Sequence, residues 1–155
     1  MEISILALPL IASIISGFFG KFIGDRNSEI ITSLLVSISA IFSGLVLYEV
    51  IVNQYQDNIV IATWISSGSL EVNWSMKIDS LSAVMLVVVT SVSALVHVYS
   101  IGYMSHDPHK PRFMAYLSLF TFAMLMLVTS DNFIQLFFGW EGVGLCSYFL
   151  IGFWF

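Results

Sequence analysis

Residues 80–103 read SLSAVMLVVVTSVSALVHVYSIGY, a run that contains no Asp, Glu, Lys or Arg. A helix needs about 20 mainly apolar residues to cross the ~30 Å hydrocarbon core of a bilayer. This run is long enough to do so. It predicts a membrane-spanning helix, and therefore a chain whose surroundings are largely lipid.

Four other stretches meet the same condition. We expect spans at about residues 3–20, 30–51, 113–129 and 132–154. Gly20 and the charged stretch Lys21 to Glu29 separate the first span from the second. Residues 105–112 (SHDPHKPR), with two prolines and six polar or charged residues, separate the third from the fourth, and His106 and His109 are expected to be solvated there. The sequence thus predicts an all-α membrane protein of about five transmembrane helices.

The composition supports a membrane class and excludes several others. Apolar residues make up 58% and charged residues 10%, against roughly 45–50% and about 25% in a soluble domain. With a net charge of −5 and five basic residues, the chain has no phosphate-binding stripe, so we expect no nucleic-acid partner. The single cysteine, Cys146, excludes an internal disulfide framework, and the chain has no chelating His/Cys pair, so we expect no metal site.

The basic residues predict the orientation of the spans. Lys21 and Arg26 lie in the first loop and Lys110 and Arg112 in the third, on one side of the membrane, whereas Lys77 falls on the other. Because Lys and Arg gather in inner loops, we expect the N-terminus to lie outside. A chance distribution of so few charges remains the alternative.

The segment from Asn53 to Asp79 has a different pattern. Its second half, 70–78, reads LEVNWSMKI and alternates apolar with polar residues, and residues 59–65 are β-branched and aromatic. Ser66 to Ser69 separates the two runs. We expect a small outer β-hairpin between the second and third helices, with one apolar face on the helix ends. An irregular loop is the alternative.

Glu141 is the leading candidate functional residue, because it is a charged residue inside an apolar span. It lies ten residues beyond Asp131, where the fifth span begins, hence about 15 Å along the axis and near the bilayer midplane. A charged residue there costs about 2.5–3.5 kcal/mol on insertion scales. A buried carboxyl group can hold a proton near neutral pH and release it to an approaching cation. A protonated Glu that hydrogen-bonds two helices together is the structural alternative.

The helix around Glu141 is predicted to have two different faces. At 100° per residue, Gln135, Gly139, Gly142 and Cys146 share a face suited to close helix packing, so Cys146 is interpreted as a packing residue. Glu141, Gly144 and Tyr148 fall on the opposite face, where Gly144 leaves room for a water molecule or a partner side chain.

A second polar stripe lies on the third span. Ser82, Thr90, Ser93, His97 and Ser100 fall within about 80° of one another on the helical wheel. His97 lies about 10 Å from the inner end, where a neutral imidazole can pass protons. The hydroxyls also have a structural explanation, because they act as interhelical contacts in membranes. We therefore name His97, with Ser93 and Ser100, as a second candidate site and keep the structural alternative open.

The stretch Gly139 to Tyr148 (GWEGVGLCSY) resembles subunit L of bacterial NADH–quinone oxidoreductase, the antiporter-like subunit called chain 5 in mitochondria. The likeness spans the chain and continues through residues 97–104 (HVYSIGYM), 107–108 (DP), 112–113 (RF), 130–132 (SDN), 8–10 (LPL) and 17–20 (GFFG). This resemblance implies a membrane-arm subunit of respiratory complex I. It implies that Glu141 pairs with a lysine on a later helix and belongs to the proton path.

The resemblance also implies where the redox chemistry lies. FMN, iron–sulfur clusters and quinone are expected on other subunits, and no cofactor on this chain. The expected partners are the lipid bilayer, the other membrane-arm subunits and the later helices of its own subunit, since family members are several times longer than a chain ending at Phe155. The expected location of the protein is a bacterial plasma membrane, and the mitochondrial inner membrane is the alternative location. A multisubunit Na+/H+ antiporter subunit and a truncated, non-transporting remnant are the alternative functions.

The orientation can be tested by cysteine labelling. Cysteines introduced within residues 21–29 and at His109 should be protected from an impermeant reagent added outside, and a cysteine at Gly68 should react. The reverse pattern would show that the helices run in the opposite direction.

Overall fold

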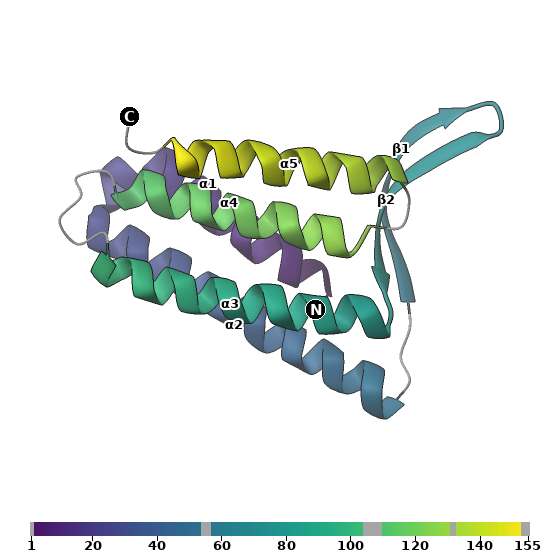
Figure 1. Ribbon diagram of the computed structural model, residues 1–155, viewed down its shortest axis with the longest axis horizontal. Helices are drawn as coiled ribbons and strands as arrows, with labels where there is room; N and C mark the ends of the chain where they lie inside the picture. The colour runs from purple at the N-terminus through teal and green to yellow at the C-terminus, as the bar shows by residue number, and fades with distance from the viewer. Residues whose placement is uncertain (1, 54–56, 104–109, 131–132, 153–155) are drawn as a thin grey trace.

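The computed structural model describes residues 2–53, 57–103, 110–130 and 133–152. Over these ranges it contains five helices and two strands (Figure 1), and all five helices are long and apolar enough to cross a membrane. The predicted all-α class with five spans is therefore confirmed. The helices are α1 (Glu2–Ile23), α2 (Asp25–Asn53), α3 (Ser80–Tyr103), α4 (Lys110–Val128) and α5 (Phe133–Ile151).

The break predicted at Gly20 and the loop predicted from Lys21 to Glu29 are wrong. Helix α1 continues to Ile23 and α2 begins at Asp25, so that Gly24 alone separates them. Gly24 has a φ of 89°, and its N–H donates to the Gly20 carbonyl over 3.0 Å. A glycine in this left-handed conformation ends a helix, whereas charged residues next to it do not.

The third predicted break is also shorter than expected. Lys110, Pro111 and Arg112 belong to the first turn of α4, where proline is tolerated because its missing N–H would have no helical partner. The rest of that predicted loop, with His106 and His109, lies outside the described residues. So do the two ends predicted for the fifth span, Asn132 and Trp154.

The segment between α2 and α3 contains β1 (Asp57–Ser67) and β2 (Leu70–Ile78), paired antiparallel from Asp57 opposite Ile78 to Ser67 opposite Leu70. The register shifts between Val60 and Ala62 and again between Thr63 and Ile65. Both strands lie at one end of the helix bundle, which we call the strand end (Figure 1). The opposite end, which carries Lys21, Arg26, Lys110 and Arg112, is the basic end.

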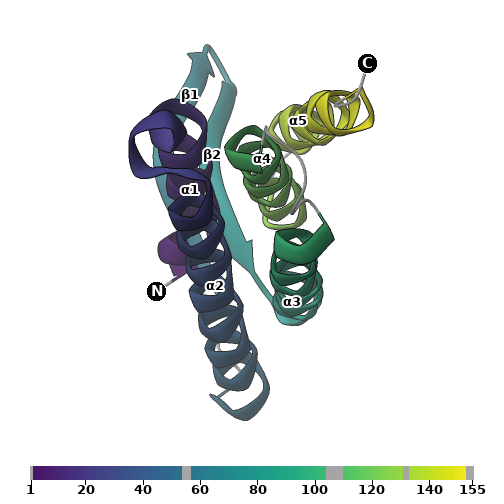
Figure 2. The ribbon, with the colours of Figure 1, turned by 90° about the vertical axis from the view of Figure 1, so that its left-hand side faces the viewer.

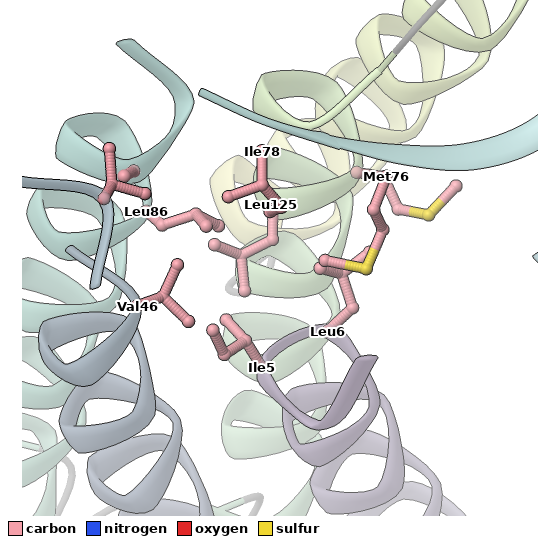
Figure 3. Close-up of a cluster of buried hydrophobic side chains, with 10 residues drawn as sticks. Ile5, Leu6, Val46, Met76, Ile78, Leu86 and Leu125 are labelled. Carbon is pink, nitrogen blue, oxygen red and sulfur yellow. The ribbon is translucent and has the colours of Figure 1, made fainter. Parts of the chain in front are cut away.

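The last residues of β2 close the strand end of the bundle. Met76 and Ile78 are buried, with Lys77 between them exposed, and they pack with residues from the ends of four helices (Figure 3). The Lys77 N–H also donates to the Thr129 carbonyl at the end of α4, over 2.8 Å. The other members of this cluster are Ile5, Leu6, Val46, Val50, Ala83, Leu86, Leu125 and Met126.

Asp79 joins the strand to α3 as the residue that caps the helix. Its Oδ1 accepts a hydrogen bond from the Ser82 N–H over 2.8 Å, which satisfies a main-chain donor in the first turn. This hydrogen bond from Ser82 lowers the pKa of the Asp79 carboxyl group. The start of α3 is thus fixed directly behind the buried end of β2.

Substituting Gly24 should destabilise the α1–α2 turn. Gly24→Ala places a side chain at a φ of 89°, which costs about 1–2 kcal/mol for an L residue. Gly44→Ala is the matched control, because Gly44 lies inside α2 with no atom within 4 Å of an added Cβ. We expect the thermal unfolding midpoint in detergent to fall for Gly24→Ala alone. Equal midpoints for the two variants would contradict this account of the turn.

Candidate functional site: a buried imidazole and an exposed intramembrane carboxylate

The polar stripe predicted on α3 does face the interior of the bundle. Ser82, Thr90, His97 and Ser100 are buried and Ser93 is half-buried. Their partners differ, however. Thr90 meets Ser43 of α2 over 2.7 Å, and the Ser100 hydroxyl donates to the Val96 carbonyl of its own helix. Of this stripe, only Ser93 and His97 join a cluster with α4.

His97 lies between α3 and α4, fully enclosed by the protein. Its Nε2 is 3.0 Å from the Ser118 hydroxyl of α4, and its Nδ1 is 2.7 Å from the Ser93 carbonyl oxygen. Nδ1 also lies 3.3 Å from the Ser93 hydroxyl, which in turn is hydrogen-bonded to the Thr121 hydroxyl of α4. Four polar side chains from two helices thus form one connected cluster, the His97 cluster.

Two members of the His97 cluster, Ser93 and Thr121, reach an apolar groove, whereas His97 and Ser118 do not line it. The groove opens between α3 and α4 with a volume of about 320 Å³, and Ser93 and Thr121 are the polar residues that line it. Val88, Val92 and Phe120 are among its apolar walls. The hydroxyls of Ser93 and Thr121 satisfy each other beneath these walls, so the cluster does not need water from the groove to complete its hydrogen bonds.

The packing face predicted for α5 is confirmed. Gln135, Gly139 and Cys146 are buried. A Cβ added at Gly139 would come within 3.0 Å of the Leu127 backbone in α4, and one at Gly142 within 3.2 Å of the Ala123 Cβ. The two glycines therefore set how closely α5 approaches α4.

The opposite face of α5 is exposed, whereas the sequence predicts a buried carboxyl group at Glu141. Glu141, Gly144 and Tyr148 all lie on it, and an added Cβ at Gly144 would meet no atom within 4 Å. Glu141 is eight residues from the start of α5 at Phe133, about 12 Å along the axis and close to the middle of the helix. Its carboxylate is therefore presented away from α4, on a surface shared with Trp140.

A buried carboxylate appears where the sequence predicts a loop. Glu29 is 5% exposed in the first turns of α2. It lies among other buried polar residues of that helix, namely Ser28, Thr32 and Ser33. The polar residues spaced within residues 28–33 are the sequence feature that could have indicated a buried polar helix face. They do not indicate one as long as the stretch is interpreted as a solvated loop.

Neither site has the donors that a metal ion requires. Among the residues that the structure describes, no three His, Cys, Asp or Glu side chains lie together. The structure instead brings together one imidazole and three hydroxyls between α3 and α4, and leaves one carboxylate on the free face of α5. The chain is a multi-span membrane protein with ionisable side chains placed within its spans.

Comparison with known sequences finds one matching family description and several similar proteins. Residues 64–114 match the family described as NADH-ubiquinone oxidoreductase (complex I), chain 5 N-terminus. NADH-ubiquinone oxidoreductase chain 5 of Arabidopsis thaliana is 57% identical over 155 residues, and that of Marchantia polymorpha is also 57% identical. The corresponding protein of Phytophthora infestans is 54% identical over 153 residues.

Each alignment covers 99–100% of this chain but only 23% of the relative. The chain is thus similar to the N-terminal portion of complex I chain 5 proteins, and it spans about a quarter of the length of these relatives.

The close approach of α5 to α4 can be tested by comparing a glycine packed against α4 with a glycine on the exposed face of α5. Gly139→Ala should lower the amount of folded protein in the membrane, because forcing atoms into a packed contact typically costs about 1–3 kcal/mol. Gly144→Ala should leave that amount unchanged, since its Cβ enters open space. Quantitative immunoblotting of membranes provides the measurement. A larger loss for Gly144→Ala would show that the packing face is wrongly assigned.

Proposed function

We propose that this chain is the N-terminal part of a membrane-arm subunit of a proton-pumping NADH–ubiquinone oxidoreductase, and that it contributes to proton translocation coupled to electron transfer. The identity to chain 5 proteins over the whole chain supports the assignment to complex I. The five spans support a place in the membrane.

The observation that carries the proposal is the position of Glu141, exposed near the middle of α5. Facing lipid, a charged side chain at that depth would cost about 2.5–3.5 kcal/mol. In the complete subunit this face therefore packs against other protein. The relatives are about four times as long as this chain, which covers 23% of them, so their further helices are the natural source of a cationic partner.

A carboxylate that meets a mobile cation can do transport work. A nearby positive charge favours the ionised carboxylate by about 1–3 pKa units, or roughly 1.4–4 kcal/mol. Moving one proton charge against 100 mV requires about 2.3 kcal/mol. Glu141 is the proposed proton-carrying residue, with Gly144 and Tyr148 beside it on the same face. His97 is the second proposed site, supported by Ser93 and by Ser100 on the same stripe.

Electron transfer belongs elsewhere in the complex under this proposal. FMN, iron–sulfur clusters and quinone are assigned to other subunits, and this chain is assigned no cofactor. Its partners are the other membrane-arm subunits and the later helices of its own subunit. The relatives come from eukaryotes, which favours the mitochondrial inner membrane. We therefore propose this location in place of the bacterial plasma membrane.

Two alternative functions differ in their support. A Na+/H+ antiporter subunit is disfavoured, because the relatives that match the chain are named as complex I chain 5. A non-transporting remnant makes a separate prediction: no substitution in this chain would change proton pumping. The experiment below distinguishes it from the proposal.

Glu141→Gln should lower the number of protons pumped per NADH oxidised while the complex still assembles. Gln preserves the volume and the hydrogen-bonding capacity but cannot ionise. The ratio is measured in sealed vesicles for Glu141→Gln and Glu141→Asp. Glu49→Gln is the matched control, because Glu49 is exposed near the end of α2, hydrogen-bonded to Asn53 over 3.0 Å. Pumping at the unmodified ratio by Glu141→Gln would leave Glu141 a structural residue.

A further inference from the structure

The hydrogen bonds between α3 and α4 determine where each proton of the His97 cluster lies. The Thr121 hydroxyl is 3.0 Å from the Leu117 carbonyl oxygen, which can only accept. Thr121 therefore donates its single proton to Leu117. In the hydrogen bond between Ser93 and Thr121, the Ser93 hydroxyl must then be the donor.

The same reasoning fixes the tautomer of His97. Nδ1 lies 2.7 Å from the Ser93 carbonyl oxygen, so Nδ1 must carry a hydrogen. A neutral imidazole has only one N–H, which leaves Nε2 as the acceptor. The Ser118 hydroxyl, 3.0 Å from Nε2, consequently donates its proton to His97.

We propose that the Ser118 hydroxyl relays protons to and from His97, and that Ser93 and Thr121 take no part in the transfer. Nδ1 already carries its hydrogen, and Ser93 uses its own proton for Thr121. Nε2 is thus the only vacant basic position of the cluster, and Ser118 is the hydroxyl that reaches it. This inference rests on the proposed function, since the exchanged proton is taken to be one that the complex translocates.

The proton transfer is balanced within the cluster. In the proposed step Ser118 passes its hydroxyl proton to Nε2 and takes up one proton from a protonated water molecule, which must reach Ser118 from outside the groove because Ser118 is buried and does not line it. The products are an imidazolium, whose Nε2–H donates to the re-formed Ser118 hydroxyl, and a neutral water. Nδ1–H keeps its bond to the Ser93 carbonyl throughout. His97 therefore gains and loses a proton without losing either of its hydrogen bonds.

This site is separate from Glu141. His97 faces α4 from α3, whereas Glu141 is exposed on the side of α5 turned away from α4. Figure 2 shows α4 between α3 and α5. The chain thus presents two ionisable sites on opposite sides of one helix, and each can be disabled without touching the other.

The test uses the assembled complex in sealed vesicles and measures proton-pumping turnover. Ser118→Ala should lower it at least tenfold, the effect of losing about 1.4 kcal/mol of transition-state stabilisation. Ser118→Thr restores a hydroxyl and should stay within about twofold of the unmodified complex, or ~0.4 kcal/mol. Thr121→Val removes the other cross-helix hydroxyl bond of the cluster and should lower turnover less than Ser118→Ala does. Ser37→Ala is the matched control, because the Ser37 hydroxyl donates to a carbonyl of its own helix.

Several outcomes would overturn the inference. If Thr121→Val loses as much turnover as Ser118→Ala, or if Ser118→Thr fails to restore it, the cluster serves packing alone. If Ser118→Ala does not assemble, Ser118→Cys decides, because a thiol of similar size is only a weak donor: unmodified turnover in that variant overturns the proposal.

A normal ratio in Glu141→Gln combined with a defective Ser118→Ala would refute the role of Glu141 and leave the role of Ser118 supported. The opposite combination would refute the role of Ser118 alone.

Discussion

Helix α4 is tied at both ends by hydrogen bonds from other parts of the chain to its main-chain carbonyls. At the basic end, the Ser16 hydroxyl of α1 donates to the Pro111 carbonyl over 2.6 Å. At the strand end, the Lys77 N–H of β2 donates to the Thr129 carbonyl over 2.8 Å. Thr129 directly follows α4, so the Lys77 N–H satisfies a carbonyl that no helical N–H reaches, whereas the Ser16 hydroxyl adds a second bond to a carbonyl in the first turn. These two contacts therefore fix the position of the helix against which α1, α2, α3 and α5 all pack.

That central position gives α4 two chemically different neighbours. Towards α3 it presents Ser118 and Thr121, whose hydroxyls contact His97 and Ser93. Towards α5 it presents Ala123 and Leu127, against which glycines allow close approach. The polar contact holds an ionisable ring in one orientation, and the apolar contact holds a carboxylate-bearing helix whose far side remains free for other protein.

The sequence predicts the spans well because apolar length is a local property, but it misplaces their ends. Lys21 to Glu29 looks like a loop, yet charged residues at a membrane surface remain helical until Gly24 adopts a φ of 89°. The buried face of α3 follows from its helical period. The partners Ser118 and Ser43 do not, because they depend on which helices become neighbours. Glu29 is missed because its stretch looks like a loop. Thr121 is missed because its contact depends on which helices become neighbours.

The length of α2 has a consequence for the surrounding bilayer. Its 29 residues span about 43 Å at 1.5 Å per residue, well beyond a hydrocarbon core of ~30 Å. Figures 1 and 2 show its C-terminal end diverging from the other helices. The polar first turn, with Asp25 and Arg26, accounts for part of this length, and the smaller apolar excess is relieved by tilting or by local thickening of the lipid. The angle between α2 and α3, and with it the contact between Ser43 and Thr90, thus becomes sensitive to membrane thickness.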